Sequence, residues 1–243
     1  MLTMKKYLTT CLLLFSASAF AQYDVNRHIT LKWSPTSLII GTVGLQAEYN
    51  FGSRYSLTAN IGLPATVRHT LTYQDSDAAF DMRASTFLAG YRCYLSDRHL
   101  SGIYLEPFFK YIHHSADGLG TGELVTRTAT FNIMNEYNAM GLGAQLGAQF
   151  LISNRVAIDL FLLGPEFDLA SNNLKAVELS GSGSWSNTEA AQAEVQIKNF
   201  IQQIPFIRNH TDVMVDKENR LVTARFKGPL PGVRAGVSLG IAF

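Results

Sequence analysis

A His-His-Ser cluster near the middle of the chain has the residue types needed for nucleophilic catalysis. His113 and Ser115 are two positions apart, and a histidine beside a serine can act as the base that activates the hydroxyl for acyl transfer. His113, His114 and Asp117 are also of the types that bind zinc. One short cluster supplies too few ligands, so we predict no metal and interpret the cluster as a solvated strand end.

Six charged side chains occur within otherwise apolar stretches: Glu48, Arg92, Glu106, Lys110, Asp159 and Arg234. Glu48 and Glu106 could form a carboxylate pair that works as general acid and base. The set contains three acids and three bases, however, so mutual ion pairing is the better account. We therefore predict an enclosed ion-pair cluster without a catalytic role.

The segments that carry these charges alternate between apolar and polar residues. Val43, Leu45, Ala47, Tyr49 and Phe51 alternate with Gln46, Glu48 and Asn50. Successive strand residues point to opposite faces, so this run predicts a strand with one apolar and one polar face. Six similar runs centre on residues 55–63, 87–95, 103–111, 140–150, 156–162 and 233–243. Their lengths are close to the ~9–11 residues of a tilted membrane-crossing strand.

An eighth, less regular strand is expected at residues 28–40, where Pro35 removes a ladder donor and indicates an edge or a bend. Short and long connections alternate along the chain. Tight turns are predicted at 51–54 and 152–155, a short connection at 96–102, and longer links at 64–82, 113–138 and 165–231. This asymmetry, with an even number of strands, is typical of outer-membrane barrels, whose short turns are periplasmic. Both termini would then lie in the periplasm.

The N-terminus has the features of a secretory signal peptide. Two lysines precede an apolar run at residues 7–20, and Ala19-Phe20-Ala21 forms a cleavage site. The run is too short to cross a bilayer as a helix, which needs ~20 residues. We predict a signal peptide at 1–21 and a single domain at 22–243.

Charge and cysteine content limit the partners and the covalent chemistry. Without the two leader lysines the chain has 18 basic and 19 acidic residues, so its formal charge changes from +1 to −1. This balance indicates no nucleic-acid partner. Cys11 leaves with the leader and Cys93 remains alone, so no internal disulfide is expected.

The placement of aromatic and charged residues indicates which face points outward. Aromatic residues stand at the ends of the apolar stripes, as in the interfacial girdles of membrane proteins: Tyr49, Phe51, Tyr111, Phe150 and Phe243. A Lys or Arg facing lipid at mid-depth costs ~2–4 kcal/mol, so the charged face should point inward. The alternative is a soluble, lipocalin-like barrel with its apolar face inside. We predict an all-β fold, a closed antiparallel up-and-down transmembrane barrel of about eight strands. Side chains should fill its interior.

The segment 168–230 is too long for a plain loop and should have its own structure. Asn187 or Thr188 can cap a helix with Glu189 in its first turn, and Pro205 would end it. The apolar residues of this helix follow helical spacing: Ala193, Ile197, Phe200, Ile201 and Ile204. Residues 213–216 and 221–226 predict a hairpin. We expect an external cap that, with the 113–138 loop, offers the surface for an unknown external partner.

Three groups of motifs carry a family resemblance: residues 34–38 with 41–45, 90–96 with 102–108, and 228–236 with 240–243. Together they resemble a family of small outer-membrane β-barrels of unknown function that is common in Bacteroides-type bacteria. The resemblance covers nearly all of the chain after the leader, and departs from the family at Cys93, where an aromatic residue is more usual. It implies an outer-membrane location, contact with membrane lipid and lipopolysaccharide, and neither cofactor nor catalytic residues. Phe243 resembles the terminal aromatic residue that barrel-assembly machinery recognises.

The spacing of His113 and Ser115 is also similar to that of outer-membrane lipid A deacylases. The acidic partner of the histidine in that family would fall near Arg127 here. The nearest acid, Glu123, has the wrong spacing, and the residues around Asp117 depart from the amide-containing motif of that family. We therefore expect a structural, adhesive or interaction role and no enzyme activity. A narrow channel or a conduit for a lipophilic ligand is the alternative, and an acyl hydrolase is a remote one.

Overall fold

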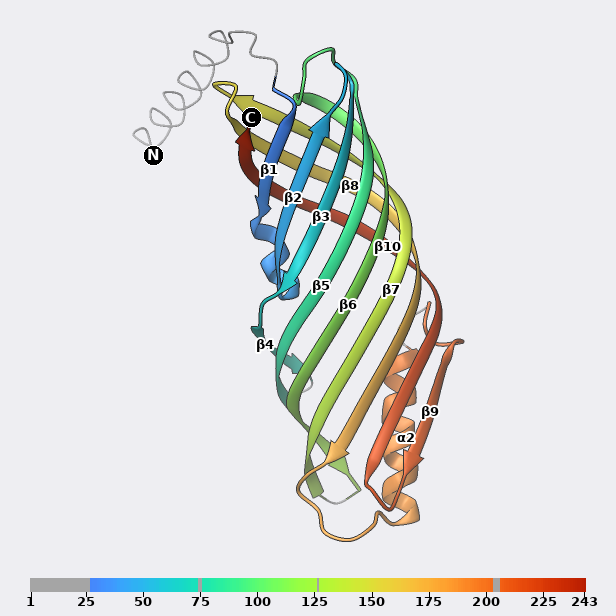
Figure 1. The fold of residues 1–243 in the computed structure, drawn as a ribbon. Coiled ribbons are helices and arrows are strands. Elements are labelled where there is room, and N and C mark those ends of the chain that lie inside the picture. Colours follow the sequence, from blue (N-terminus) through green and yellow to red (C-terminus); the bar gives the residue numbers. More distant parts are fainter. Residues whose placement is uncertain (1–26, 74–75, 126, 203–205) are drawn as a thin grey trace, which may run out of the picture.

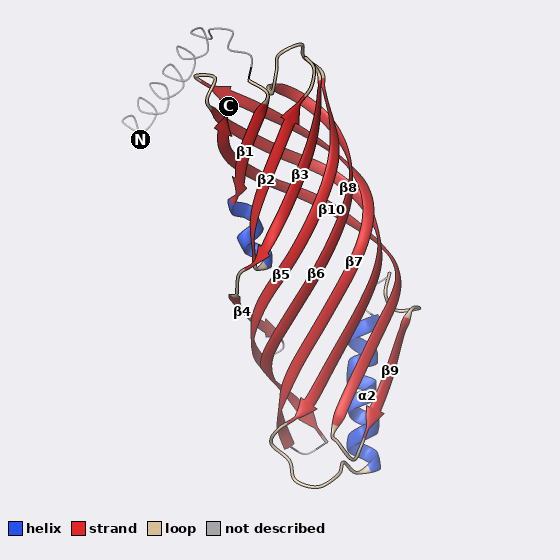
Figure 2. Ribbon diagram, viewed as in Figure 1, coloured by secondary structure: helices blue, strands red, loops and turns tan. Residues whose placement is uncertain are grey.

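The computed structural model describes residues 27–243 apart from 74–75, 126 and 203–205, so the predicted signal peptide lies outside the described residues. The described chain is mostly β-structure (Figure 2). The C-terminus and the start of β1 lie at one end of the molecule, and α2 and β9 lie at the other (Figure 1). The elements are β1 Ile29–Ser34, η1 Pro35–Ile40, β2 Thr42–Asn50, β3 Tyr55–Pro64, β4 Val67–Tyr73, β5 Ser76–Tyr94, β6 Gly102–Leu124, β7 Arg127–Ile152, β8 Val156–Glu178, α2 Asn187–Gln202, β9 Thr211–Asp216 and β10 Leu221–Ala242.

Eight of the strands form a closed ring of antiparallel hydrogen bonds in the order β1-β2-β3-β5-β6-β7-β8-β10. The ring closes where β1 pairs with β10, from Thr30 opposite Ala242 to Trp33 opposite Leu239. Two strands lie outside the ring, because β4 pairs with β5 and β9 pairs with β10. The predicted antiparallel ring of about eight strands is confirmed, as are the three short connections at 51–54, 96–102 and 152–155.

The long strands pass through two regions that differ in character. We call the region near the C-terminus the ring half; it comprises β1, β2, β3 and residues 87–94, 102–111, 140–152, 156–169 and 233–242. We call the remainder the extension; it comprises β4, α2, β9 and residues 76–86, 112–124, 127–139, 170–178 and 221–232. Only part of the sheet continues into the extension, because β1, β2 and β3 end in the ring half.

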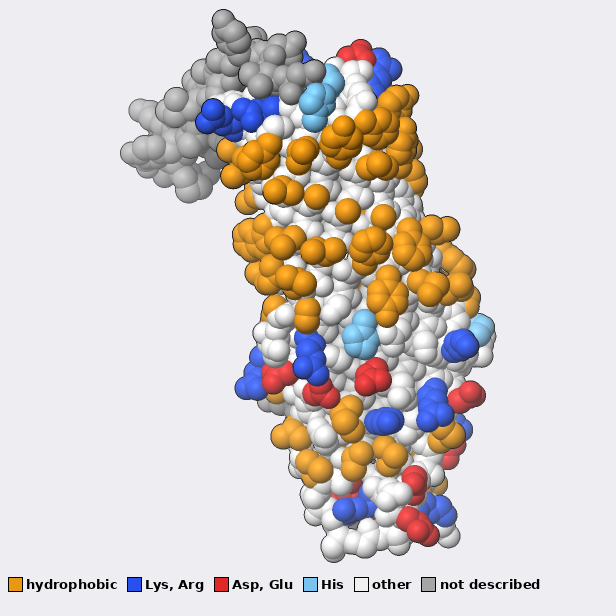
Figure 3. All heavy atoms as spheres, viewed as in Figure 1, with side chains coloured by type: hydrophobic (Ala, Val, Ile, Leu, Met, Phe, Trp, Pro, Cys, Tyr) orange, Lys and Arg blue, Asp and Glu red, His pale blue; other side chains and the backbone are white. Residues whose placement is uncertain are grey.

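The outer surface of the ring half is apolar (Figure 3). Large hydrophobic side chains, with some alanines among them, recur on it at alternate positions of the strands, and Leu57, Leu142 and Val233 are 54%, 67% and 75% exposed. We call this surface the apolar belt. Its other members include Leu31, Leu45, Ile61, Phe87, Tyr91, Leu105, Phe109, Leu146, Phe150, Leu163, Leu169 and Ile241. The predicted direction of the apolar stripes, away from the axis of the ring, is confirmed.

The extension has the opposite polarity. Its outer surface carries charged residues (Figure 3), and its inner surface packs against α2. A hydrophobic core forms there from Leu124, Ala129, Trp185, Ala190, Ala193 and Val222. A second cluster of Ala139, Ala170 and Phe226 lies nearer the ring half. The extension is therefore built like an ordinary water-exposed domain, with apolar residues inside.

The links predicted at 64–82 and 113–138 are wrong as loops, because strands occupy most of both, and the two ends of the 165–231 segment also belong to strands. Residues 113–124 and 127–138 continue β6 and β7, and residues 165–178 and 221–231 continue β8 and β10. These stretches do alternate, but Thr and Asn stand on the outer face where the ring half has large apolar residues. The change of pattern at the boundary concealed the continuity of each strand.

Two further predictions about element ends need correction. Ser186, rather than Asn187 or Thr188, caps α2: its hydroxyl accepts from the Glu189 amide (3.2 Å), and Glu189 Oε2 accepts from the Ser186 amide (2.9 Å). Pro35 ends β1 and begins η1, so the predicted eighth strand stops at Ser34. The helix and the hairpin of β9 with β10 are confirmed, while Ile204 and Pro205 lie outside the described residues.

Candidate functional site

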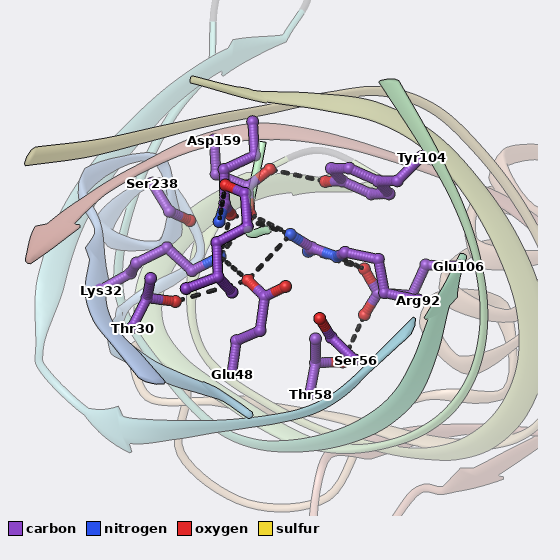
Figure 4. Close-up of polar contacts among 12 residues, drawn as sticks. Thr30, Lys32, Glu48, Ser56, Thr58, Arg92, Tyr104, Glu106, Asp159 and Ser238 are labelled. Atoms are coloured by element: carbon purple, nitrogen blue, oxygen red, sulfur yellow. Dashed lines mark hydrogen bonds and ion pairs between the residues drawn. The ribbon is translucent and has the colours of Figure 1, made fainter. Parts of the chain in front are cut away.

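The interior of the ring half holds a connected network of charged side chains (Figure 4). Lys32, Glu48, Arg92, Glu106 and Asp159 come from β1, β2, β5, β6 and β8, and each side chain is completely buried. Their inward direction follows from strand alternation, because their neighbours in sequence stand on the apolar belt. The ring thus brings charges from five strands to one place.

Arg92 is the centre of this network. Its guanidinium donates to Glu106 Oε2 (2.7 Å) and Asp159 Oδ2 (3.0 Å), and it also reaches Glu48 Oε2 (3.2 Å). The ring of Tyr104 lies 3.7 Å from the guanidinium carbon, a cation–π distance. Charged groups inside a protein need this kind of complete pairing, because removing them from water is costly.

Lys32 is a member that the sequence analysis missed. Its ammonium donates to Glu48 Oε2 (2.9 Å), Asp159 Oδ2 (2.7 Å) and Gln149 Oε1 (2.6 Å). The irregular first strand concealed it, although Leu31 and Trp33 on either side do alternate with it. With Lys32 the network has two cations and three carboxylates.

Neutral side chains complete the network and fill the remaining space. Tyr94 donates to Glu48 Oε1 and Tyr104 to Asp159 Oδ1, both at 2.6 Å. Thr58 donates to Glu106 Oε1 (2.5 Å). Glycines on neighbouring strands make the space: a Cβ at Gly147 would lie 2.3 Å from the Tyr104 hydroxyl. The interior of the ring half is therefore filled at this level.

The other two members of the predicted cluster lie apart from this network. Lys110 donates instead to Glu166 Oε1 (2.6 Å) and Asp168 Oδ2 (2.9 Å), both on β8. Arg234 has no carboxylate within ion-pair distance among the described residues, and its guanidinium lies over the rings of Phe161 (4.8 Å) and Phe108 (5.6 Å). The structure thus brings together Glu48, Arg92, Glu106 and Asp159, and separates Lys110 and Arg234 from them.

The His-His-Ser cluster lies within β6 and not at a strand end. His113 Nδ1 is 2.7 Å from Asn138 Oδ1, while the Ser115 hydroxyl accepts from Arg83 (2.9 Å). A serine whose oxygen accepts from a cation, and whose nearby histidine is bonded elsewhere, lacks the nucleophile–base contact of a hydrolase. The arrangement does not support acyl transfer.

Outside the network, the buried carboxylate of Glu178 ties α2 to the end of β8 in the extension. It accepts from Arg127, from Trp185 Nε1 (2.5 Å) and from Ser180 Oγ (3.1 Å), and its side chain is fully buried. The hydrogen bond from Arg127, assisted by those from Trp185 and Ser180, lowers the pKa of Glu178 to about 2 against the opposing effect of burial. This contact anchors the loop that leads into the helix.

The terminal residue Phe243 continues the pairing of β10 with β1 beyond Ala242. Its amide donates to Ile29 O (2.8 Å) and its carbonyl accepts from His28 N (3.0 Å), while its side chain is 60% exposed. The terminal aromatic side chain therefore stands free beside the apolar belt.

Comparisons with known proteins add no further information. A scan against protein-family models and searches of curated proteins and of solved structures found no match. Within the described part of the chain, no helix combines the length and the hydropathy needed to cross a membrane.

Proposed function

We propose that this chain is an integral outer-membrane β-barrel with a plugged interior, and that it has a structural, adhesive or interaction role and no catalytic one. The observation that carries the proposal is the apolar belt around a ring of strands whose interior is charged. In water such an exterior would be costly, since exposed apolar patches on soluble proteins rarely exceed a few hundred Å². In a bilayer the same exterior is favourable.

The closed ring of hydrogen bonds supports the same proposal. Lipid provides no partners for backbone N–H and C=O groups, so a sheet within it has to close on itself. Pairing of β1 with β10 gives that closure at the level of the belt. The exposed aromatic residues at the end of the belt near the termini, such as Phe51, Tyr55 and Phe243, suit the interface between lipid and water.

The filled interior argues for a plug and against a general channel. Arg92 and its partners occupy the axis of the ring with fully buried side chains. An eight-stranded barrel has an interior about wide enough for side chains alone. We expect the purified protein to give no steady conductance in a planar bilayer, and a reproducible ion current would contradict the plug.

The extension provides the surface for interaction with a partner. It projects beyond the belt with a polar exterior, and it presents α2 and β9 at the end farthest from the C-terminus (Figure 1). In the proposed orientation this end is external, where lipopolysaccharide and other molecules are encountered. The terminal Phe243 would serve as the signal for barrel-assembly machinery.

Cell fractionation with heat-modifiable electrophoresis tests the proposal. We expect the protein in the outer-membrane fraction, resistant to carbonate, and migrating differently before and after boiling because the closed barrel resists detergent. Complete extraction by carbonate or salt would contradict membrane insertion. A Phe243→Ser variant that assembles as well as the natural protein would remove the role given to the terminal aromatic residue.

A further inference from the structure

A cavity of about 300 Å³ lies at the boundary between the ring half and the extension. Lys110, Glu166 and Arg234 line its polar part, and Ile40, Val233 and Ala235 line its apolar part. Its volume is at the lower end of the range for small-molecule sites, which are concave and have a few polar groups among apolar walls. Neither the plug nor the extension requires this space.

An unpaired stretch of β10 borders the cavity. On this edge Lys227 N donates to His210 O (3.2 Å), and ten residues along Val237 N donates to Thr36 Oγ1 (3.3 Å). Within the described residues, the intervening stretch 228–236 has no strand partner on that edge, because β9 pairs only as far as Phe226 and β1 only as far as Leu239.

Two prolines on this edge of β10 indicate that the sequence favours an unpaired edge here. Pro229 and Pro231 follow Lys227 at alternate positions, so their backbone nitrogens face the same edge. Proline has no N–H to leave unpaired, which is why it is found at strand edges that lack a neighbour. The two prolines therefore remove two of the N–H donors that this edge beside the cavity would otherwise leave unpaired.

The mouth of the cavity reaches the apolar belt. Val233 lines the cavity and is 75% exposed on the outward face of β10, and Ile40 of η1, which also lines the cavity, is 40% exposed. Ala235, on the same outward side of β10 as Val233, is exposed as well. A ligand can therefore extend from the cavity sideways onto the belt.

The polar part of the cavity contains a cationic group and a carboxylate oxygen that both lack a hydrogen-bond partner in the described part of the chain. Arg234, which lines it, has neither a hydrogen bond nor an ion pair among the described residues. Glu166 has a side chain only 10% exposed; its Oε1 accepts from Lys110, whereas its Oε2 is buried and has no partner. Buried polar atoms normally have partners. An occupant with an anionic group for Arg234 and a donor for Glu166 would satisfy both.

We propose that this cavity binds the head group of an anionic single-chain amphiphile, such as a fatty acid or a lysophospholipid, with the acyl chain lying on the belt beside Val233. The guanidinium of Arg234, held against Phe108 and Phe161, donates to the carboxylate or phosphate. A head-group hydroxyl donates to Glu166 Oε2. The route of the acyl chain depends on the proposed membrane location, whereas the recognition of the head group does not.

Ligand binding to the folded full-length protein in a neutral detergent tests the inference. The probes are palmitate and palmitoyl-lysophosphatidylglycerol, with hexadecanol as the uncharged control, and native mass spectrometry counts the bound molecules. We expect one molecule of either anionic probe per chain, tighter binding of the lysophospholipid because it has hydroxyl donors, and weak binding of hexadecanol. Equal binding of hexadecanol would overturn the head-group assignment.

Matched variants separate the site from general adhesion to the belt. Arg234→Gln should weaken binding of both anions about tenfold or more, since a hydrogen bond to a charged group is lost. Arg225→Gln, on the same strand but exposed in the extension, should bind like the natural protein. Ala235→Trp should obstruct the mouth without changing any charge, and serves if Arg234→Gln does not fold. Equal binding by all three variants would overturn the proposal.

The two proposals fail in different ways. A protein that fractionates with the outer membrane and binds neither anionic probe contradicts the ligand site alone. A protein that is recovered as soluble yet binds palmitate through Arg234 contradicts the membrane location, and with it the sideways entry, while the head-group site stands.

Discussion

The two regions of β10 show how one strand can carry opposite patterns of polarity. In the extension its inward residues are Val222, Ala224 and Phe226, and outward Arg225 is exposed. In the ring half the inward residues are polar or small and the outward ones are large and apolar, such as Leu239. Strand geometry decides which side each residue faces, and the surroundings decide which polarity suits that side.

The difference also changes what stabilises each region. The extension buries apolar side chains, so it gains from the hydrophobic effect in the usual way. The ring half buries charges, and its interior is stable only while every charge keeps its partners. Truncating one buried side chain should therefore destabilise the ring half by leaving a charge unpaired. In the extension the same kind of substitution should destabilise by leaving a cavity.

Removing Arg92 should give the largest effect. Arg92→Met leaves three buried carboxylates with Lys32 as their remaining cation, and breaking a buried ion-pair network costs about 3–5 kcal/mol. Unfolding in urea, followed by heat-modifiable migration, measures the loss. Arg54→Met, in an exposed pair with Asp97, is the control and should be unchanged. Equal stability of both variants would mean that the interior is hydrated.

Trp185→Ala should affect the extension and leave the ring half intact. Trp185 is 4% exposed, packs in the core beneath α2 and donates to Glu178, and loss of such a side chain costs about 3 kcal/mol locally. We expect faster proteolysis around α2 with unchanged heat-modifiable migration. Val195→Ala, at an exposed position of the same helix, should behave like the natural protein. Concerted loss of both regions would show that they do not differ in stability.

Two arginine substitutions on the outer face of β6 test the surroundings directly. Leu105 lies on the belt and Thr121 on the extension, and both are exposed. In a membrane Leu105→Arg should cost ~2–4 kcal/mol if it lies near mid-depth, whereas Thr121→Arg should cost little. Folding into lipid vesicles over a range of urea concentrations measures both. If the two variants cost the same, the belt does not face lipid.

Lowering the pH should destabilise the extension, and this should be the smallest of the four effects. Because the pKa of Glu178 is lowered from 4.5 to about 2, its stabilising contribution is present above pH 4.5 and is lost as the pH falls toward 2. Hydrogen exchange of α2 amides should rise over this interval. Glu178→Gln should remove this pH dependence, and an unchanged profile in that variant would assign it to another group.

Much of the ring half could be predicted from the sequence. The seven alternating runs correspond to β2, β3, β5, β6, β7, β8 and β10 of the structure, because the period of two is a local property of a strand. The same pattern predicted that Arg92 and Glu106 point away from the apolar face. The continuation of β6, β7, β8 and β10 into the extension was not predicted, because large apolar residues give way there to Thr and Asn outside and to Ala inside, and no apolar stripe marks the strand.

The sequence by itself determined which residues share a face, because alternation requires only the backbone of one strand. Only the tertiary structure decided which of those residues meet. Arg92 reaches Asp159, 67 positions away, and Lys32 joins them because the ring aligns β1, β5 and β8 at one level. The same alignment places Arg234 of β10 too far from the network to join it, so its guanidinium lies beside the cavity, unpaired within the described residues.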